Sequence, residues 1–425
     1  MALINKLNAI GDAIREKTGK TDLLTLEQMP IEIAAIETGG GGGDLPEEAL
    51  LITGNCSYRF ANGGWDWFIN TFGKKIKTEG ITNADYMFQN SNQLKEVPFD
   101  INISNGSAAN IFLNAGITET PDIIGTVTGA GTAFSGCSQL VTYDCPSLVL
   151  GNNASISGLF KNCHALKNLN SPLKGGAVNY TSDLFYNCLN LREIPESFFE
   201  ELEVAVGTGS RASIFQGCYS LRKVPKSVYK LLTTTTTTST YSSPYMYLIN
   251  SCSVLDELVD LGVNQTTWTS DMFRDTFDNA FRLKKVTFET NDDGTPIAVK
   301  WKSQVIDLSY YVGYVYSYYE NRVTDYNSGI TSAKKANYAE KYAELKNDSD
   351  WYTTEYDFSR YNHDSAVETI NSLPDTSAYL ATAGGTNTIK FKGTAGSKTD
   401  GGAINTLTEA EIAVAAAKGW TVTLV

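Results

Sequence analysis

Three short stretches of the chain contain residue types that could do chemistry. The first, "LFKNCHAL", places Cys163 beside His164, and a thiol and an imidazole are the components of a cysteine nucleophile and its base. The second, "YNHDSAV", has a histidine, an aspartate and a serine in a row at 363–365, the residue types of a catalytic triad. The third, "GTAGSKTDGG" at 393–402, is similar to a phosphate-binding loop.

The spacing of these residues argues against all three activities. Triad members must converge from different elements, so three consecutive residues at 363–365 predict a helix-entry turn instead. A phosphate-binding loop has glycine directly before lysine, whereas Ser397 intervenes here, which favours a glycine-rich turn. His164 fills a variable slot, which predicts a surface side chain. We therefore expect no enzyme activity, no metal site and no cofactor.

The cysteines follow a pattern that indicates packing. Five of the seven occupy the same position of a repeated unit, and other units have serine or alanine there. Serine and alanine can replace a small buried thiol, but neither can replace a thiolate ligand or nucleophile. The cysteines of the pattern are Cys137, Cys163, Cys188, Cys218 and Cys252, and Ser91, Ala115 and Ala280 stand in their place elsewhere.

The repeated unit has the form aromatic, small polar pair, cysteine, leucine, aliphatic residue, proline. Each unit is too small to bury its own apolar face, so the units must stack, with ladders of phenylalanine, leucine and Val/Ile side chains along the axis. We predict an α+β fold, with a short N-terminal helical hairpin, an irregular leucine-rich-repeat solenoid and a C-terminal helix-strand cap. The eight units begin at Phe88, Phe112, Phe134, Phe160, Phe185, Phe215, Ile249 and Phe277.

Composition shifts divide the chain into five regions. We expect residues 1–38 to form a helical docking or oligomerisation segment, because an apolar stripe recurs at helical spacing. The glycine-rich residues 39–44 are a linker. The remaining regions are an N-terminal cap at 45–85, the solenoid at 86–290, and a tyrosine-rich insertion with C-terminal capping elements at 291–425. The docking stripe consists of Leu3, Leu7, Ile10 and Ile14.

The end of the chain predicts a helix followed by a strand. In "LTEAEIAVAAAKGWTVTLV", Thr408 and Glu411 have the spacing of a capping box, and Gly419 ends the helix. The segment "NTIKFKG" predicts a strand because apolar and polar residues alternate.

Polar pairs between the core leucine and the core aliphatic residue are candidate binding residues. In a strand they would include the outward-facing position, although a merely solvated face is the other interpretation. The tyrosine-rich segment is a second candidate, since aromatic faces stack on sugar rings, but packing against the last unit explains it equally well. The candidates are Lys167, Arg192, Glu193, Arg222, Lys223, Lys284, Tyr310, Tyr314, Tyr316 and Tyr318.

Composition and charge exclude several partners. The formal net charge of −13 disfavours binding to nucleic acid or to an anionic membrane surface. No window reaches the roughly 20 apolar residues that span a bilayer. The N-terminal residues lack the continuous apolar core of a secretory signal, so we expect synthesis and assembly in a cytoplasm, where unpaired cysteines are usual.

The unit F-x-N/G-C-x-x-L-x-x-I/V-P resembles the leucine-rich repeats of the BspA-like bacterial surface proteins, over roughly 86–290. The segment "LNAIGDAIREKTGKTDLLTLEQMPIEI" is similar to the N-terminal segment of tail-associated structural proteins of phages and prophages of Gram-positive bacteria. The ending "TDGGAINTLTEAEIAVAAAKGWTVTLV" is similar to C-terminal endings of phage-encoded repeat proteins.

These resemblances imply a virion protein of a tail, baseplate or tail fibre that is assembled in the host cytoplasm. Residues 1–38 would dock on other tail or baseplate proteins, and the repeats would bind a glycan or protein of the host surface. A homotrimer is expected from the way fibres are usually built. The alternative is a structural or decoration protein of the virion without a receptor role.

Overall fold

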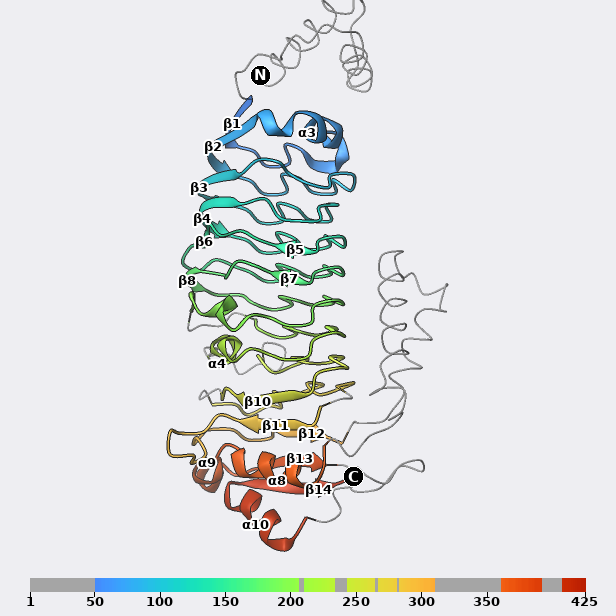
Figure 1. The fold of residues 1–425 in the computed structure, drawn as a ribbon. Helices are drawn as coiled ribbons and strands as arrows, with labels where there is room; N and C mark the ends of the chain where they lie inside the picture. Colours follow the sequence, from blue (N-terminus) through green and yellow to red (C-terminus); the bar gives the residue numbers. More distant parts are fainter. Residues whose placement is uncertain are drawn as a thin grey trace, which may run out of the picture.

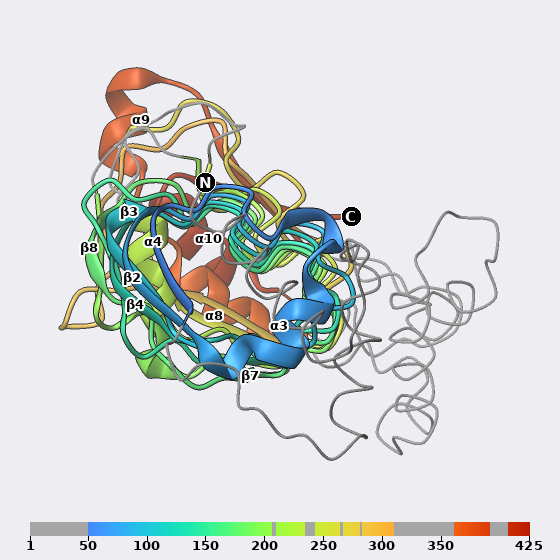
Figure 2. The same cartoon turned by 90° about the horizontal axis from the view of Figure 1, so that it is seen from above.

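The computed structural model describes residues 50–205, 210–233, 243–263, 267–280, 283–309, 361–391 and 407–425. From residue 50 onward the chain forms a column of similar turns, each lying on the one before (Figure 1). The view along the column shows the turns superimposed on one another (Figure 2). Apolar side chains fill the interior that they enclose. The predicted docking helices at 1–38, the linker at 39–44 and the four candidate tyrosines lie outside the described residues.

One sheet runs along most of the column, and all its paired strands are parallel. Its longer strands alternate buried and outward-facing residues, as in β2, so apolar side chains cover only the inner face. In sheet order, the seven strands are β1 (Leu50–Asn55), β2 (Ile76–Asn83), β3 (Ile101–Ser107), β4 (Ile123–Gly129), β6 (Leu148–Leu150), β8 (Gly175–Val178) and β9 (Leu202–Val204).

Three smaller parallel sheets complete the β-structure. They are β5 (Thr142–Tyr143) with β7 (Asn168–Leu169), β10 (Glu257–Leu261) with β11 (Lys285–Phe288), and β12 (Val305–Leu308) with β13 (Asn387–Phe391) and β14 (Trp420–Leu424). The helices are short: α3 (Asp66–Phe72), α4 (Tyr229–Thr233), α8 (His363–Ser372), α9 (Ser377–Ala383) and α10 (Glu409–Ala417). Single 3-10 turns are η1 (Ala61–Gly63), η2 (Gly73–Lys75), η3 (Glu196–Phe199) and η4 (Lys226–Val228).

The predicted fold class, an α+β leucine-rich-repeat solenoid, is therefore wrong. The described residues have a mostly parallel architecture dominated by the seven-stranded sheet, with few helices. Strands were expected after the core leucine of each unit, but the main sheet is made by segments that precede the phenylalanine, as β3 precedes Phe112.

Proline explains why the expected strands are missing from several units. Units that end in Pro98, Pro195 or Pro225 have no strand after their core leucine, because proline has no N–H to donate to a neighbouring strand. The last two units lack this proline, and there β10 and β11 form.

The predicted phenylalanine ladder is confirmed. Ring centroids of successive units lie 4.8–5.9 Å apart from Phe88 to Phe215, with interplanar angles of 3–12°. The ladder also includes Phe60, whose ring lies 5.4 Å from that of Phe88. This earlier turn was not predicted, because "FANGGWDWF" contains neither the cysteine nor the leucine of the unit.

Each turn bends at two residues in the left-handed region, four positions apart. Asn, Asp and Gly dominate these sites because they adopt positive φ at low cost. The pairs are Tyr58 and Asn62, Tyr86 and Asn90, Asn110 and Asn114, Thr132 and Gly136, Gly158 and Asn162, Asp183 and Asn187, Ser213 and Gly217, Tyr247 and Ser251, and Asp275 and Asn279.

The C-terminal elements cover the last turn of the column (Figure 1). The predicted capping box of Thr408 and Glu411 is confirmed at the start of α10, and the predicted strand "NTIKF" is β13. Helix α8 begins with a second capping box, between Asn362 and Ser365, so the predicted helix-entry turn is also confirmed. Both helices are thus fixed at their N-termini by side chains that accept backbone N–H groups.

Candidate binding surface

The cysteines lie in the interior, as predicted. All seven are buried and free of disulfides. In the repeated position each thiol donates a hydrogen bond to the carbonyl of a phenylalanine in the preceding unit; for Cys188 and Phe160 the distance is 3.1 Å. Ser91 donates to the Phe60 carbonyl in the same way at 2.9 Å. The position therefore takes a small buried side chain, and a thiol or hydroxyl there donates to the preceding unit.

Burial also makes these thiols poor nucleophiles. Desolvation raises the pKa of Cys137 and Cys145 to about 12 and raises the pKa of Cys163 and Cys188 well above the ordinary range. A thiol is reactive as the thiolate, so these side chains are unreactive in the folded chain.

The two histidines occupy different environments, one buried in the column and the other at the start of α8. His164 was expected at the surface, but it is only 6% exposed. The same slot is buried at Leu189 and Tyr219 and exposed at Asn92. The second histidine, His363, lies at the start of α8, where its Nε2 is 3.2 Å from an oxygen of Glu411 in α10. The hydroxyl of Ser365 bonds to Asn362, so the row at 363–365 is a helix start.

Three of the predicted binding residues occupy equivalent positions in consecutive units. Lys167, Arg192 and Arg222 each follow the ladder phenylalanine of their unit by seven residues, and all three are exposed. The Arg222 N–H donates to the Arg192 carbonyl at 2.9 Å, so the two arginines belong to directly adjacent turns. We call these three residues the basic column; adjacent turns are about 4.8 Å apart.

Acidic and basic residues flank the basic column. Lys223 is exposed, and its Nζ is 3.0 Å from Glu196, while Lys226 pairs with Asp260. This hydrogen bond with Asp260 raises the pKa of Lys226. Exposed pairs of this kind contribute little to stability. Glu193 is exposed beside Arg192.

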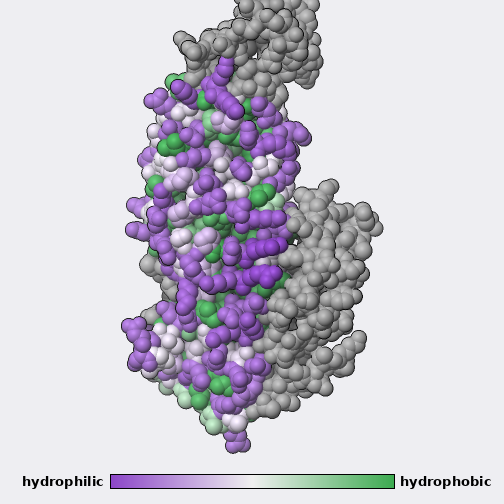
Figure 3. Space-filling model, in the orientation of Figure 1, coloured by the Kyte–Doolittle hydropathy of each residue, from purple (hydrophilic) through white to green (hydrophobic). Residues whose placement is uncertain are grey.

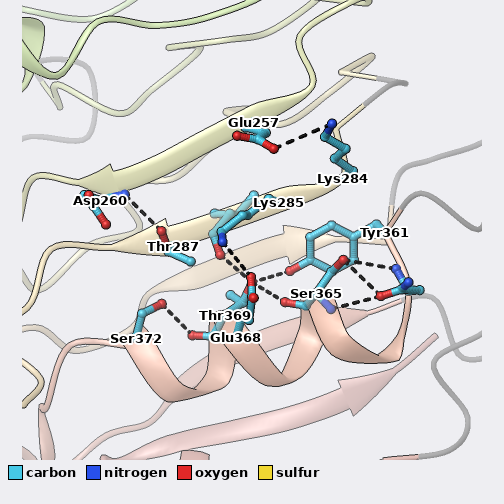
Figure 4. Close-up of polar contacts among 12 residues, drawn as sticks. Glu257, Asp260, Lys284, Lys285, Thr287, Tyr361, Ser365, Glu368, Thr369 and Ser372 are labelled. Carbon is cyan, nitrogen blue, oxygen red and sulfur yellow. Dashed lines mark hydrogen bonds and ion pairs between the residues drawn. The ribbon is translucent and has the colours of Figure 1, made fainter. Parts of the chain in front are cut away.

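At the C-terminal end of the column, an ion pair connects β11 to α8 (Figure 4). Lys284 Nζ lies 3.6 Å from Glu257, and Lys285 Nζ lies 3.0 Å from Glu368 of α8. Lys284 therefore belongs to a charged pair at the end of the column, although it shares its position in the unit with Arg192. The space-filling view shows hydrophilic side chains over much of the visible face of the column (Figure 3).

The strand geometry expected for the basic column is not observed. Arg192 and Glu193 lie in extended chain outside any strand, and Lys223 makes only an isolated parallel bridge with Glu257. The proline that ends each of these units lacks a backbone N–H and so prevents a longer run of backbone pairing between turns.

A second polar edge was missed in the sequence. The amide of Asn114 donates to Asn90 at 3.1 Å, and that of Asn90 donates to Asn62 at 3.2 Å. Beside this amide ladder, the exposed Tyr58 stacks on Tyr86 with centroids 4.6 Å apart and planes 5° apart. The recurring Asn or Gly two residues after each phenylalanine was the signal, since both residues favour positive φ.

The described residues contain no group of three or more His, Cys, Asp or Glu side chains placed to hold a metal ion. None of the helices in the described ranges is long and apolar enough to cross a membrane. Comparisons with protein-family models, with curated proteins and with solved structures find no match for this chain.

Proposed function

We propose that this chain is a non-enzymatic virion protein of a phage tail, baseplate or tail fibre, and that it binds the host cell surface through the face that carries the basic column. The observation that carries the proposal is the stacking of Lys167, Arg192 and Arg222 at one position of adjacent turns. Backbone hydrogen bonds fix the turns, so little backbone conformational entropy is lost when a ligand binds.

The spacing of the column favours an extended ligand with regularly placed anionic groups. Charges about 4.8 Å apart act together on a polymer that lies along the column. The chain as a whole is acidic, with a net charge of −13, so attraction of an anionic ligand depends on local groups of basic residues such as this column. A charged glycan of the host surface has these properties.

The virion assignment is supported by the resemblance of residues 7–33 and 399–425 to phage tail proteins. Residues 1–38 would dock on other tail or baseplate proteins, and a homotrimer is the proposed assembly. Deletion of 1–38 should abolish incorporation into particles while the remainder stays folded. Particles that retain the truncated protein would refute the docking role.

Binding of the purified full-length chain to host cells and to isolated host-wall polymer tests the receptor role. We expect saturable binding that weakens as salt is added, because exposed charges are screened. Absence of binding at any concentration would refute the receptor role and favour a structural or decoration protein of the virion.

A further inference from the structure

One arginine lies inside the column. Arg211 has 0% of its surface exposed, although it occupies a position that is apolar in most turns. That position lies two residues before the first left-handed residue of each turn. Its other occupants are Cys56, Ala84, Ala108, Ala130, Ile156, Thr181, Tyr245 and Phe273, all buried.

The guanidinium of Arg211 is only partly satisfied. Its Nη2 donates to the Ala205 carbonyl at 2.8 Å, whereas its Nε and Nη1 have no hydrogen-bond partner. Burial lowers the pKa of Arg211 to about 10, so the group still carries its charge at neutral pH. A buried charge without a counter-charge is strongly unfavourable, and buried arginines are normally paired.

Two further buried polar atoms, in the turn adjacent to that of Arg211, also lack partners. The Thr181 N–H donates to the Ser210 carbonyl at 3.1 Å, which places Thr181 in the turn adjacent to Arg211. The Thr181 hydroxyl and the Asn179 Oδ1 are both buried and without a partner. Asn179 lies two residues before Thr181, on the other side of the exposed Tyr180 in the sequence.

We propose that Arg211, Thr181 and Asn179 form a closed binding site for a small monovalent anion, with chloride as the natural occupant. One negative charge neutralises the guanidinium, whose two unused N–H groups and the Thr181 hydroxyl are donors. The amide of Asn179 adds a further donor when its oxygen and nitrogen exchange places. Because Arg211 and Thr181 are fully buried, a glycan chain or another polymer cannot reach them.

Thermal unfolding in sodium chloride and in sodium gluconate at equal ionic strength tests this site, because gluconate is too large to enter. We expect chloride to raise the Tm of the full-length chain in a saturable way, by about 5 °C at ~100 times the Kd. Arg211→Met, which keeps the volume and removes the charge, should lose this response. Arg274→Met removes an exposed arginine outside the basic column and should keep it.

Equal Tm values of the unaltered protein in the two salts would overturn the proposal, as would a chloride response that survives in Arg211→Met. If Arg211→Met does not fold, crystals of the unaltered protein grown in sodium bromide give an independent answer. An anomalous bromide peak within hydrogen-bond distance of the Arg211 guanidinium supports the site. A water molecule there, without anomalous signal, overturns it.

Discussion

The backbone N–H of Arg222 donates to the carbonyl of Arg192 at 2.9 Å, which fixes these two arginines in register on adjacent turns. Their side chains are exposed, and Lys167 continues the basic column in the preceding unit. The proposed host-surface binding depends on this register, since a rigid row of charges can engage several groups of one polymer.

Replacing Cys188 by serine should leave the fold and any binding intact. The serine hydroxyl can donate to the Phe160 carbonyl as Ser91 donates to Phe60, and the Cys163 N–H already satisfies that carbonyl at 3.0 Å. We expect the free energy of unfolding to fall by about 1–2 kcal/mol, measured by denaturant titration. Cys188→Ala is the matched control without a donor. Loss of binding in a folded Cys188→Ser protein would contradict the packing role.

Asn187 provides a test of the left-handed turn positions. Its φ is +59°, and its amide donates to Asn162 at 3.1 Å. Asn187→Val should lower the free energy of unfolding by about 1–2 kcal/mol or more, because a branched side chain is strained at positive φ. Asn187→Gly should cost less, since Gly136 and Gly217 occupy the same position in other turns. A valine variant as stable as the glycine variant would contradict this interpretation.

The contact between His363 and Glu411 predicts a pH-dependent link between α8 and α10. Hydrogen bonds to Asp364 and Glu411 raise the pKa of His363 above its ordinary 6.5. The Thr408 backbone N–H, followed by the Thr408 hydroxyl and His363, lowers the pKa of Glu411 below 4.5. The stabilisation that the charged His363 adds to the folded state is complete below pH 6.5. It is lost as the pH rises through the raised pKa of His363. The stabilisation that the charged Glu411 adds to the folded state is present above pH 4.5. It is lost as the pH falls through the lowered pKa of Glu411.

Thermal unfolding of the unaltered protein and of His363→Gln checks this link. The difference in Tm between the two proteins should be largest at about pH 5.5 and should shrink by about pH 8.5. A difference that is the same at both pH values would show that the contact acts without the histidine's charge.

Repetition made the buried residues predictable. Phenylalanine, cysteine and leucine recur at fixed offsets, and a repeated offset determines which side chains share a ladder even when the strands are unknown. The location of the strands was not predictable in the same way, because strand formation depends on where neighbouring turns can exchange hydrogen bonds. Prolines such as Pro195 and Pro225 remove donors from the segment that was expected to pair.

The candidate site was predictable only in part. The register of Arg192 and Arg222 follows from their equal offset from the ladder phenylalanines. The burial of Arg211 does not follow from the repeat. Its unit is preceded by a longer connection, and a charged residue at its offset would be assigned to the surface. The Tyr58 and Tyr86 stack depends on a turn whose sequence departs from the repeated pattern.

The most direct test of the proposed function compares the binding of two charge-reversal variants to purified anionic host-wall polymer. Arg192→Glu with Arg222→Glu alters the basic column, while Lys74→Glu with Lys77→Glu makes the same charge change at exposed positions near the other end of the described chain. We predict that the arginine variant loses affinity by at least about tenfold at low salt, with an unchanged Tm, and that the lysine variant binds as the unaltered protein does. Equal affinity of all three proteins for the polymer would contradict the account.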